Sequence, residues 1–331
     1  MKKAKWFATV LVVASIILCA VGCANETVVP EMVLVKGGGF PAWVDVSSID
    51  YYEGGFIKDR TVCDFYMGKY EVTQEEYASV MTGQKVIVYG KEYELESNPS
   101  YCTKDSTEYT LFSGDVQEKR PVEGVSWYDA VWYCNALSEK EGLTKAYNIE
   151  VTEIEQAWGK TGYSIYEATV ALNANATGYR LPTSAEWEYA ARGGEPTVAD
   201  WFYVFSGADT AEGVSYDNKK NAGLDSVGWY CYNSITGITE DFNAAGSVSG
   251  KGTHQVGKKA PNRLGLYDMS GNVGEWCYND HWVSAPSREI RGGGWRLPAD
   301  YASVFDNSVG SAPFNRFDEW GFRVVRPNSI D

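Results

Sequence analysis

The chain has 331 residues and a formal net charge of −15 at pH 7. Its length suffices for one large domain or two ordinary ones. Acidic side chains repel phosphate backbones and anionic lipid headgroups, so the charge argues against nucleic acid as a partner and against polybasic docking on a membrane.

The N-terminal 22 residues are typical of an export signal. Lys2, Lys3 and Lys5 precede an apolar run over residues 6–21 that is too short for a comfortable membrane span. Small residues stand directly before Cys23, which predicts that Cys23 carries a lipid in the mature protein. The alternative is a plain cleaved signal in which Cys23 is incidental. The lipid prediction implies an exported protein, anchored to a membrane at the outer membrane or cell surface.

After the signal we expect a tether over residues 23–30 and a single domain over residues 31–331. Thr73 and Glu76 form a capping-box pattern at the start of one helix, and Ser126 and Thr183 open two more. Apolar runs at 32–35 and 322–325 predict strands, whereas two long stretches, 83–119 and 196–252, are rich in turn residues. These signals predict a single α+β domain with little regular secondary structure.

Five cysteines lie beyond the signal, and none of them forms a CxxC pair, which argues against a zinc site. They are Cys63, Cys102, Cys134, Cys231 and Cys277. An odd number of cysteines in an exported protein leaves at least one thiol unpaired within the chain. Their spacing does not determine any pairing.

Five sequence blocks occur in order between Met32 and Pro327. They are FYMGKYEVT at 65–73, PVEGVSW at 121–127, YRLPT at 179–183 followed by EWE, GLYDMSGNVGEW at 265–276, and a closing RGG…GFR. Together they resemble the formylglycine-generating-enzyme, or sulfatase-modifying-factor, family. The resemblance implies a C-type-lectin-like fold of the formylglycine-generating-enzyme type.

The enzymes of this family oxidise a substrate cysteine and hold copper with two of their own cysteines. The corresponding positions here are Leu297 and Ala302, which offer no thiolate for Cu(I). Relatives that use iron hold it with three histidines, whereas this chain has only His254 and His281. We therefore expect no enzymatic activity and no catalytic cofactor, and an oxidase is the less favoured alternative.

A calcium loop of the family matches residues 268–275. The resemblance implies that Asp268 and Glu275 supply carboxylates and that Gly271 and Val273 supply carbonyl oxygens, the hard ligands that Ca²⁺ prefers. The alternative is that both carboxylates simply cap turns. The expectation is a structural calcium ion.

The segment 296–318 contains no Lys, Glu, Gln, Met or Trp, although Glu, Lys and Trp are frequent elsewhere in the chain. These five residue types are the ones that an Asn codon AAC or AAT cannot reach when only its adenines change. Such a bias is the signature of a diversity-generating retroelement, and known targets of these elements are similar to this chain in using the same lectin-like fold. The alternative is an ordinary loop-and-strand segment of a noncatalytic relative in the cell envelope.

Within a variable region of about residues 291–325, small or apolar residues form an expected fixed frame, namely Ala299, Ala302, Ser303, Val304 and Pro313, with Arg316. The expected variable, ligand-binding positions are Arg296, Leu297, Pro298, Asp300, Tyr301, Phe305, Asp306, Val309, Gly310, Ser311, Ala312, Phe314, Asn315, Phe317 and Asp318. Mixed aromatic and small polar residues are typical of paratopes. We therefore predict noncovalent binding of a protein or another macromolecule, with Tyr301, Phe305, Phe314 and Phe317 as exposed aromatic anchors.

Overall fold

The structure is a computed structural model that describes residues 27–40, 61–210, 220–234, 251–281 and 286–328. Two small sheets join the ends of the chain to its middle. One has the strand order β1-β4-β13, with β1 Met32–Val35, β4 Phe65–Gly68 and β13 Val325–Pro327 all antiparallel to their neighbours. The other has the order β11-β10-β9-β12, formed by Gly310–Ser311, Arg288–Arg291, Gly274–Asp280 and Trp320–Gly321. Strand β12 lies parallel to β9, which fixes the end of the C-terminal segment against this sheet.

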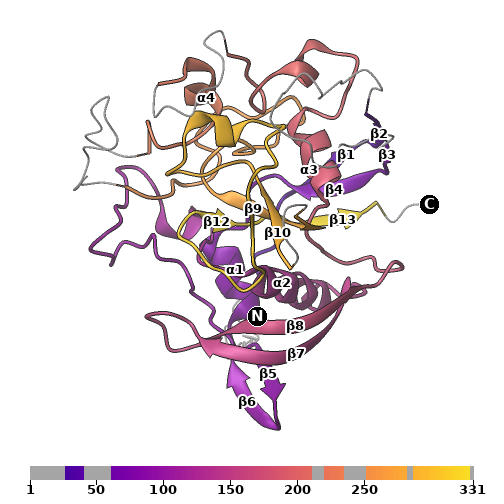
Figure 1. Ribbon diagram of the computed structural model, residues 1–331, viewed down its shortest axis with the longest axis vertical. Coiled ribbons are helices and arrows are strands. Elements are labelled where there is room, and N and C mark those ends of the chain that lie inside the picture. Colours follow the sequence, from indigo (N-terminus) through magenta and orange to yellow (C-terminus); the bar gives the residue numbers. More distant parts are fainter. Residues whose placement is uncertain (1–26, 41–60, 211–219, 235–250, 282–285, 329–331) are drawn as a thin grey trace, which may run out of the picture.

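Three two-stranded antiparallel sheets make up the rest of the β structure in the described residues. They pair β2 Gly38–Gly39 with β3 Thr61–Val62, β5 Lys85–Val88 with β6 Lys91–Glu94, and β7 Tyr147–Gln156 with β8 Tyr163–Leu172. Figure 1 shows the β5–β6 and β7–β8 hairpins at the lower end of the molecule, beneath α2, with α3 and α4 toward the other end.

The helices begin where the side chains can cap them. Thr73, Ser126 and Thr183 each accept a hydrogen bond from the backbone of the third following residue, whose carboxylate bonds back to the cap. The helices are α1 Gln74–Met81, α2 Trp127–Lys140, α3 Ser184–Ala191 and α4 Ala222–Val227, with short 3₁₀ turns at Gln117–Lys119, Ala199–Phe202 and Ala299–Ala302. The three helices expected from the sequence are thus confirmed.

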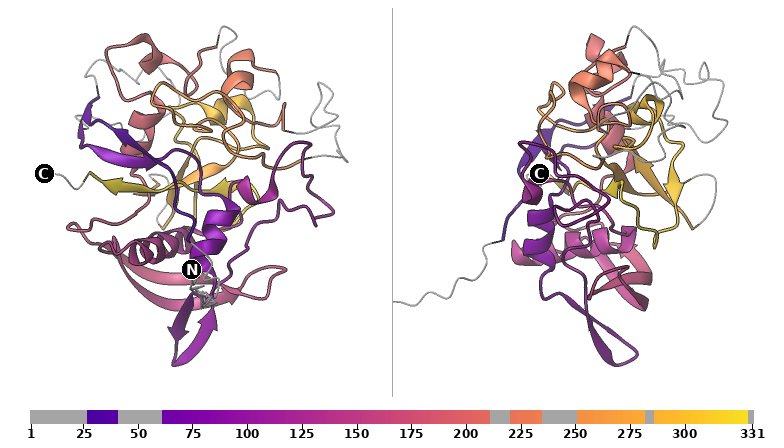
Figure 2. Two further views of the ribbon diagram at one scale, coloured as in Figure 1. Left: turned by 180° about the vertical axis from the view of Figure 1, so that it is seen from behind. Right: turned by 90° about the vertical axis from the view of Figure 1, so that its left-hand side faces the viewer.

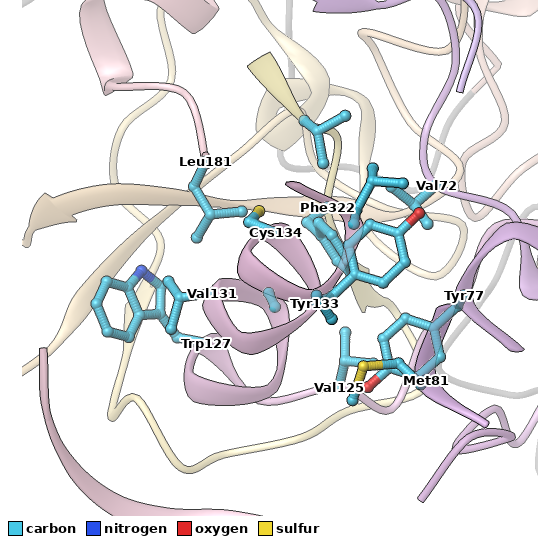
Figure 3. Packing of buried hydrophobic residues seen from close by; sticks show 14 of the residues in the cluster. Val72, Tyr77, Met81, Val125, Trp127, Val131, Tyr133, Cys134, Leu181 and Phe322 are labelled. Carbon is cyan, nitrogen blue, oxygen red and sulfur yellow. The ribbon is translucent and has the colours of Figure 1, made fainter. Parts of the chain in front are cut away.

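The main core lies where α1 and α2 meet the closing part of the chain. Tyr77 of α1 stacks on Tyr133 of α2 with ring centroids 5.4 Å apart, and Phe322 packs edge-on against Tyr133 at 5.3 Å. All three side chains are buried (Figure 3). Because these rings come from distant parts of the chain, the C-terminal end is part of the core and not an appendage.

Some expectations from the sequence need correction. The run 322–325 is not a strand, because β12 ends at Gly321 and β13 begins at Val325. The turn-rich stretches contain the β5–β6 hairpin and α4, which the sequence interpretation did not include. The signal, Cys23 and the first half of the tether, residues 23–26, lie outside the described residues. Within the described ranges, no helix is both long enough and apolar enough to cross a membrane.

Candidate ligand-binding face

The C-terminal segment, residues 296–318, starts from a buried frame. Arg291 is 1 % exposed, and its Nη2 atom donates to Glu188 Oε2 at 2.9 Å and to the Val304 carbonyl at 2.8 Å. Gly293 has φ 74°, and a Cβ there would lie 2.9 Å from backbone atoms of Tyr301 and Ala302. Only glycine combines this backbone conformation with so close an approach.

A buried ion pair holds the other end. Arg323 donates from Nε to Glu275 Oε2 and from Nη2 to Glu275 Oε1, both at 2.7 Å, and both side chains are fully buried. Arg323 also donates to the carbonyls of Gly68 and Tyr267, and Trp187 Nε1 donates to Glu275 at 2.8 Å. This fully hydrogen-bonded arrangement compensates for removing both charges from water.

Between these ends, backbone hydrogen bonds attach the segment to the scaffold. The amide of Val304 donates to Val204 at 2.9 Å, and the amides of Trp127 and Gly124 donate to Pro313 and Phe317 at 3.0 Å. The expected frame positions Ala299, Ala302, Ser303, Val304 and Pro313 are all buried, whereas Arg316, the other expected frame position, is half-buried. The frame therefore has a direct structural reason to stay constant, since any larger side chain would meet packed atoms.

The expected contact positions are placed differently. Arg296, Gly310 and Phe317 are exposed. Those that are half-buried are Leu297, Pro298, Asp300, Tyr301, Phe305, Asp306, Val309, Ser311, Ala312, Phe314 and Asn315. All of these positions reach solvent, and they alternate along the chain with the buried frame.

Asp318 is the exception, and its placement on an exposed face is wrong. It is 9 % exposed, its Oδ2 accepts a hydrogen bond from the Tyr109 hydroxyl at 2.6 Å, and its Oδ1 accepts one from Arg296 at 3.0 Å. The buried Asp318 carboxylate thus fixes the orientation of the Arg296 side chain.

The four expected aromatic anchors are not equally available. Phe317 is 44 % exposed. Phe314 stacks on Tyr166 at 4.7 Å, and Phe305 packs against a core cluster with the Arg192 guanidinium 5.8 Å from its ring. Tyr301 is half-buried. The expectation of four freely exposed rings is therefore wrong for all except Phe317.

Burial shapes the charge of this face. It raises the pKa of Asp300 to about 6, and the neighbouring charge of Asp306 acts in the same direction. It also raises the pKa of Glu319 to about 7, against the lowering effect of Arg296, whose Nε lies 3.7 Å from Glu319 Oε2. At pH 7 the Asp300 carboxyl is therefore mostly ionised and that of Glu319 about half ionised, and the exposed Arg296 carries the opposite charge on the same face.

The positions of the family's copper cysteines hold no thiol. Leu297 is half-buried, Ala302 is buried, and the Leu297 carbonyl accepts the amide of Cys231 at 3.1 Å. Burial raises the pKa of Cys231 to about 12, so its sulfur is poorly suited to act as a thiolate. Cys63, Cys102, Cys134 and Cys277 are free thiols.

The sequence analysis expected neither histidine to be a metal ligand, and each makes contacts of its own. His254 is stacked between Phe112 and Trp229 at 4.0 and 3.7 Å, with Nδ1 3.1 Å from Asp115. His281 Nε2 lies 3.2 Å from the Asn307 carbonyl. Both histidine side chains therefore take part in packing and hydrogen bonding within the fold.

The expected calcium ligands do not form an ion-binding shell. Asp268 is buried with Oδ1 lacking a hydrogen-bond partner, but three donors from Arg323 and Trp187 already occupy the Glu275 carboxylate. The described residues contain no group of three or more His, Cys, Asp or Glu side chains placed to hold a metal. The Gly271 and Val273 carbonyls alone cannot complete the shell that Ca²⁺ needs. Calcium stays a prediction that this geometry does not support.

Sequence reasoning missed residues outside the C-terminal segment that contact it. Tyr166 supports Phe314, Glu155 forms an ion pair with Arg316, and Tyr109 holds Asp318. No local pattern marks these residues, since their role depends on long-range pairing.

Comparison with known proteins identifies the lineage. The family model "Sulfatase-modifying factor enzyme 1-like domain" matches residues 20–328. The chain belongs to this family. Its fold is therefore the α+β lectin-like fold of the formylglycine-generating enzyme, with little regular secondary structure, as the sequence predicted.

Three relatives are informative. The chain is 36 % identical to "Chaperone protein LppX" of Paenibacillus barcinonensis over 97 % of this chain and 99 % of that protein. It superposes on the structure of "Treponema denticola variable protein 1" with a TM-score of 0.61 and 30 % identity, covering 89 % of this chain and 94 % of that one. It is 24 % identical to "Inactive C-alpha-formylglycine-generating enzyme 2" of Bos taurus, over 89 % and 87 % of the two chains.

Proposed function

We propose that this protein is a surface-displayed lipoprotein that binds protein or other macromolecular ligands noncovalently through residues 296–318. In this proposal a retroelement diversifies the segment, Cys23 bears the lipid anchor, and the protein is not an enzyme. The fold supplies a rigid scaffold, and function resides in the side chains that the scaffold presents.

One observation carries the proposal. The positions expected to vary, apart from Asp318, reach solvent, whereas the expected frame positions Ala299, Ala302, Ser303, Val304 and Pro313 are buried. A substitution at a solvent-reaching position changes the surface with little effect on packing. A substitution at a buried frame position disturbs the core.

Two comparisons favour binding over catalysis. The Treponema protein of similar structure is named a variable protein, and the Bos taurus relative is named inactive. Leu297 and Ala302 stand where the enzymes of the family use cysteine. An oxidase of the copper type would need both thiolates.

The arrangement also suits display from a lipid anchor. In the right-hand view of Figure 2, the indigo segment that begins at residue 27 lies on one side of the molecule, and most of the yellow C-terminal segment lies on the other. A tether that leaves from the first side would hold the C-terminal segment away from the membrane.

The deciding experiment is DNA sequencing next to the gene and across several isolates. We expect a nearby near-copy of the 3′ end with adenines at the variable codons, and isolates that differ at those codons. An invariant 3′ end without such a copy would exclude diversification by a retroelement.

The relative from Paenibacillus supports a second candidate, a chaperone. It matches nearly the whole chain and is named a chaperone, and Phe317 and Trp158 are apolar side chains open to a client. If this is the function, the purified protein should slow the aggregation of reduced lysozyme, and Phe317→Ala should weaken that effect. Aggregation at an unchanged rate would exclude it for this client.

A further inference from the structure

Trp158 is an unusually exposed tryptophan outside the C-terminal segment. It lies in the turn between β7 and β8, and 76 % of its surface is accessible. Large aromatic side chains that stay in water on a folded protein often mark a contact with another molecule, and tryptophan is enriched among the residues that dominate binding energy.

The turn that carries Trp158 is fixed to the scaffold. The amide of Ala157 donates to the Gly162 carbonyl at 3.0 Å, and Lys160 Nζ donates to the Ser100 carbonyl at 2.9 Å. The Glu96 carboxylate accepts the Gly162 amide at 3.0 Å. Trp158 is therefore presented on an ordered turn, so a ligand would not have to order this backbone on binding.

Trp158 is connected through contacts to the C-terminal segment. Its ring lies 6.0 Å from that of Tyr101, and the Tyr101 ring lies so close to Gly124 that a Cβ there would come within 2.9 Å of it. The Gly124 amide in turn donates to the carbonyl of Phe317 at 3.0 Å. Three successive contacts thus link Trp158 to the backbone of Phe317.

Two side-chain contacts tie the rest of the hairpin to the same segment. Tyr166 of β8 stacks on Phe314, and Glu155 of β7 forms an ion pair with Arg316. The β7–β8 hairpin therefore forms part of the support of the proposed ligand-binding face.

We infer that Trp158 is an invariant aromatic contact of this face and that it receives a lysine or arginine side chain of a protein ligand, next to an apolar side chain packed on Phe317. This inference rests on the proposed function. It adds a constant contact to a face whose other positions vary, and it names the chemistry of the partner.

Charge favours a cationic partner at Trp158. The hairpin from Tyr147 to Leu172 contains four glutamates, and its only basic residue is Lys160, which is bonded to Ser100. The whole chain carries a net charge of −15. A cation over an indole face gains roughly 0.5–2 kcal/mol, and the net negative charge of the hairpin and of the whole chain favours its approach.

The test uses the full mature chain and a random-peptide phage library as the probe. Peptides selected on the wild-type protein are measured against Trp158→Ala, Trp158→Phe and Phe317→Ala. Tyr89→Ala is the matched control, because Tyr89 is 91 % exposed on the separate β5–β6 hairpin. Thermal unfolding of each variant checks that it is folded, and the exposure of Trp158 predicts no loss of stability.

We expect selected peptides rich in Lys or Arg beside an apolar residue, with affinity about tenfold lower for Trp158→Ala, partly restored in Trp158→Phe and unchanged in Tyr89→Ala. Peptides that depend on Phe317 and not on Trp158 would overturn the inference and leave the proposed function standing. Peptides indifferent to both variants, or a selection that yields none, would overturn both.

Discussion

The indole nitrogen of Trp295 donates a hydrogen bond of 2.8 Å to the backbone carbonyl of Asp318. Trp295 directly precedes the proposed ligand-binding segment and Asp318 is its last residue, so the bond closes the segment into a loop with a fixed base. Trp295 is itself buried and lies against Tyr109, whose hydroxyl holds the Asp318 side chain. Because the Trp295 bond ends on the backbone of Asp318, it does not depend on which side chain occupies that position.

Trp295→Phe removes this bond while keeping most of the ring. We expect the free energy of unfolding to fall by about 1–3 kcal/mol, because the Asp318 carbonyl loses its indole donor in a buried place. Urea unfolding measures the loss, and hydrogen exchange should show faster exchange across residues 296–318. Exchange that stays as slow as in the wild type would mean that the bond does not close the loop.

The helices were predictable because their signals are local. Thr73 and Glu76 make the capping box of α1 within one turn, and the same holds at Ser126 and Thr183. The strand expected at 322–325 was misplaced, because the Phe322 side chain packs against Tyr133 in the core and Phe322 is not part of a strand. Hydrophobic runs of that length do not distinguish these two outcomes.

The candidate face was predictable only in part. Composition marked the segment 296–318, and burial separates its frame from its surface. The burial of Asp318 was not predictable, because it depends on Tyr109, which is 209 positions away in the sequence. The contribution of Trp158 depends in the same way on the packing of the β7–β8 hairpin, which a single sequence does not specify.

The separation of frame and surface predicts a contrast between two neighbouring kinds of substitution. Val304→Ala should lower the free energy of unfolding by about 1–3 kcal/mol, because Val304 is fully buried and its loss leaves a cavity. Arg296→Ala should change it by less than about 1 kcal/mol, because the Arg296 side chain is 47 % exposed and Asp318 keeps its hydrogen bond from Tyr109. Chemical denaturation of both variants decides the matter, and equal losses would contradict the division into frame and variable positions.

The Glu275–Arg323 pair predicts that removing one of the two buried charges lowers the free energy of unfolding more than removing both. Arg323→Met leaves a buried carboxylate without its counterion, so we expect a loss of about 3–5 kcal/mol. The double variant Glu275→Gln with Arg323→Met should recover part of this loss, since the charge of Glu275 is removed together with its counterion. A double-mutant cycle measured by urea unfolding checks the coupling, and additive losses would show that the two residues act independently.

Glu319 predicts a specific dependence of stability on pH. Burial raises its pKa from 4.5 to about 7, so between these pH values the folded chain binds a proton that the unfolded chain has released. Its contribution to stability is therefore complete below pH 4.5 and is lost as the pH rises through 7. Glu319→Gln cannot ionise, so above pH 7 it should be more stable than the wild type by about 1–3 kcal/mol, with the difference vanishing near pH 4.5.

Burial also raises the pKa of Glu123 to about 7, so the informative quantity is the difference between the stability curves of the wild type and of Glu319→Gln, and not either curve alone. Parallel curves from pH 4.5 to 8 would mean that Glu319 titrates normally and that the base of the loop is open to water.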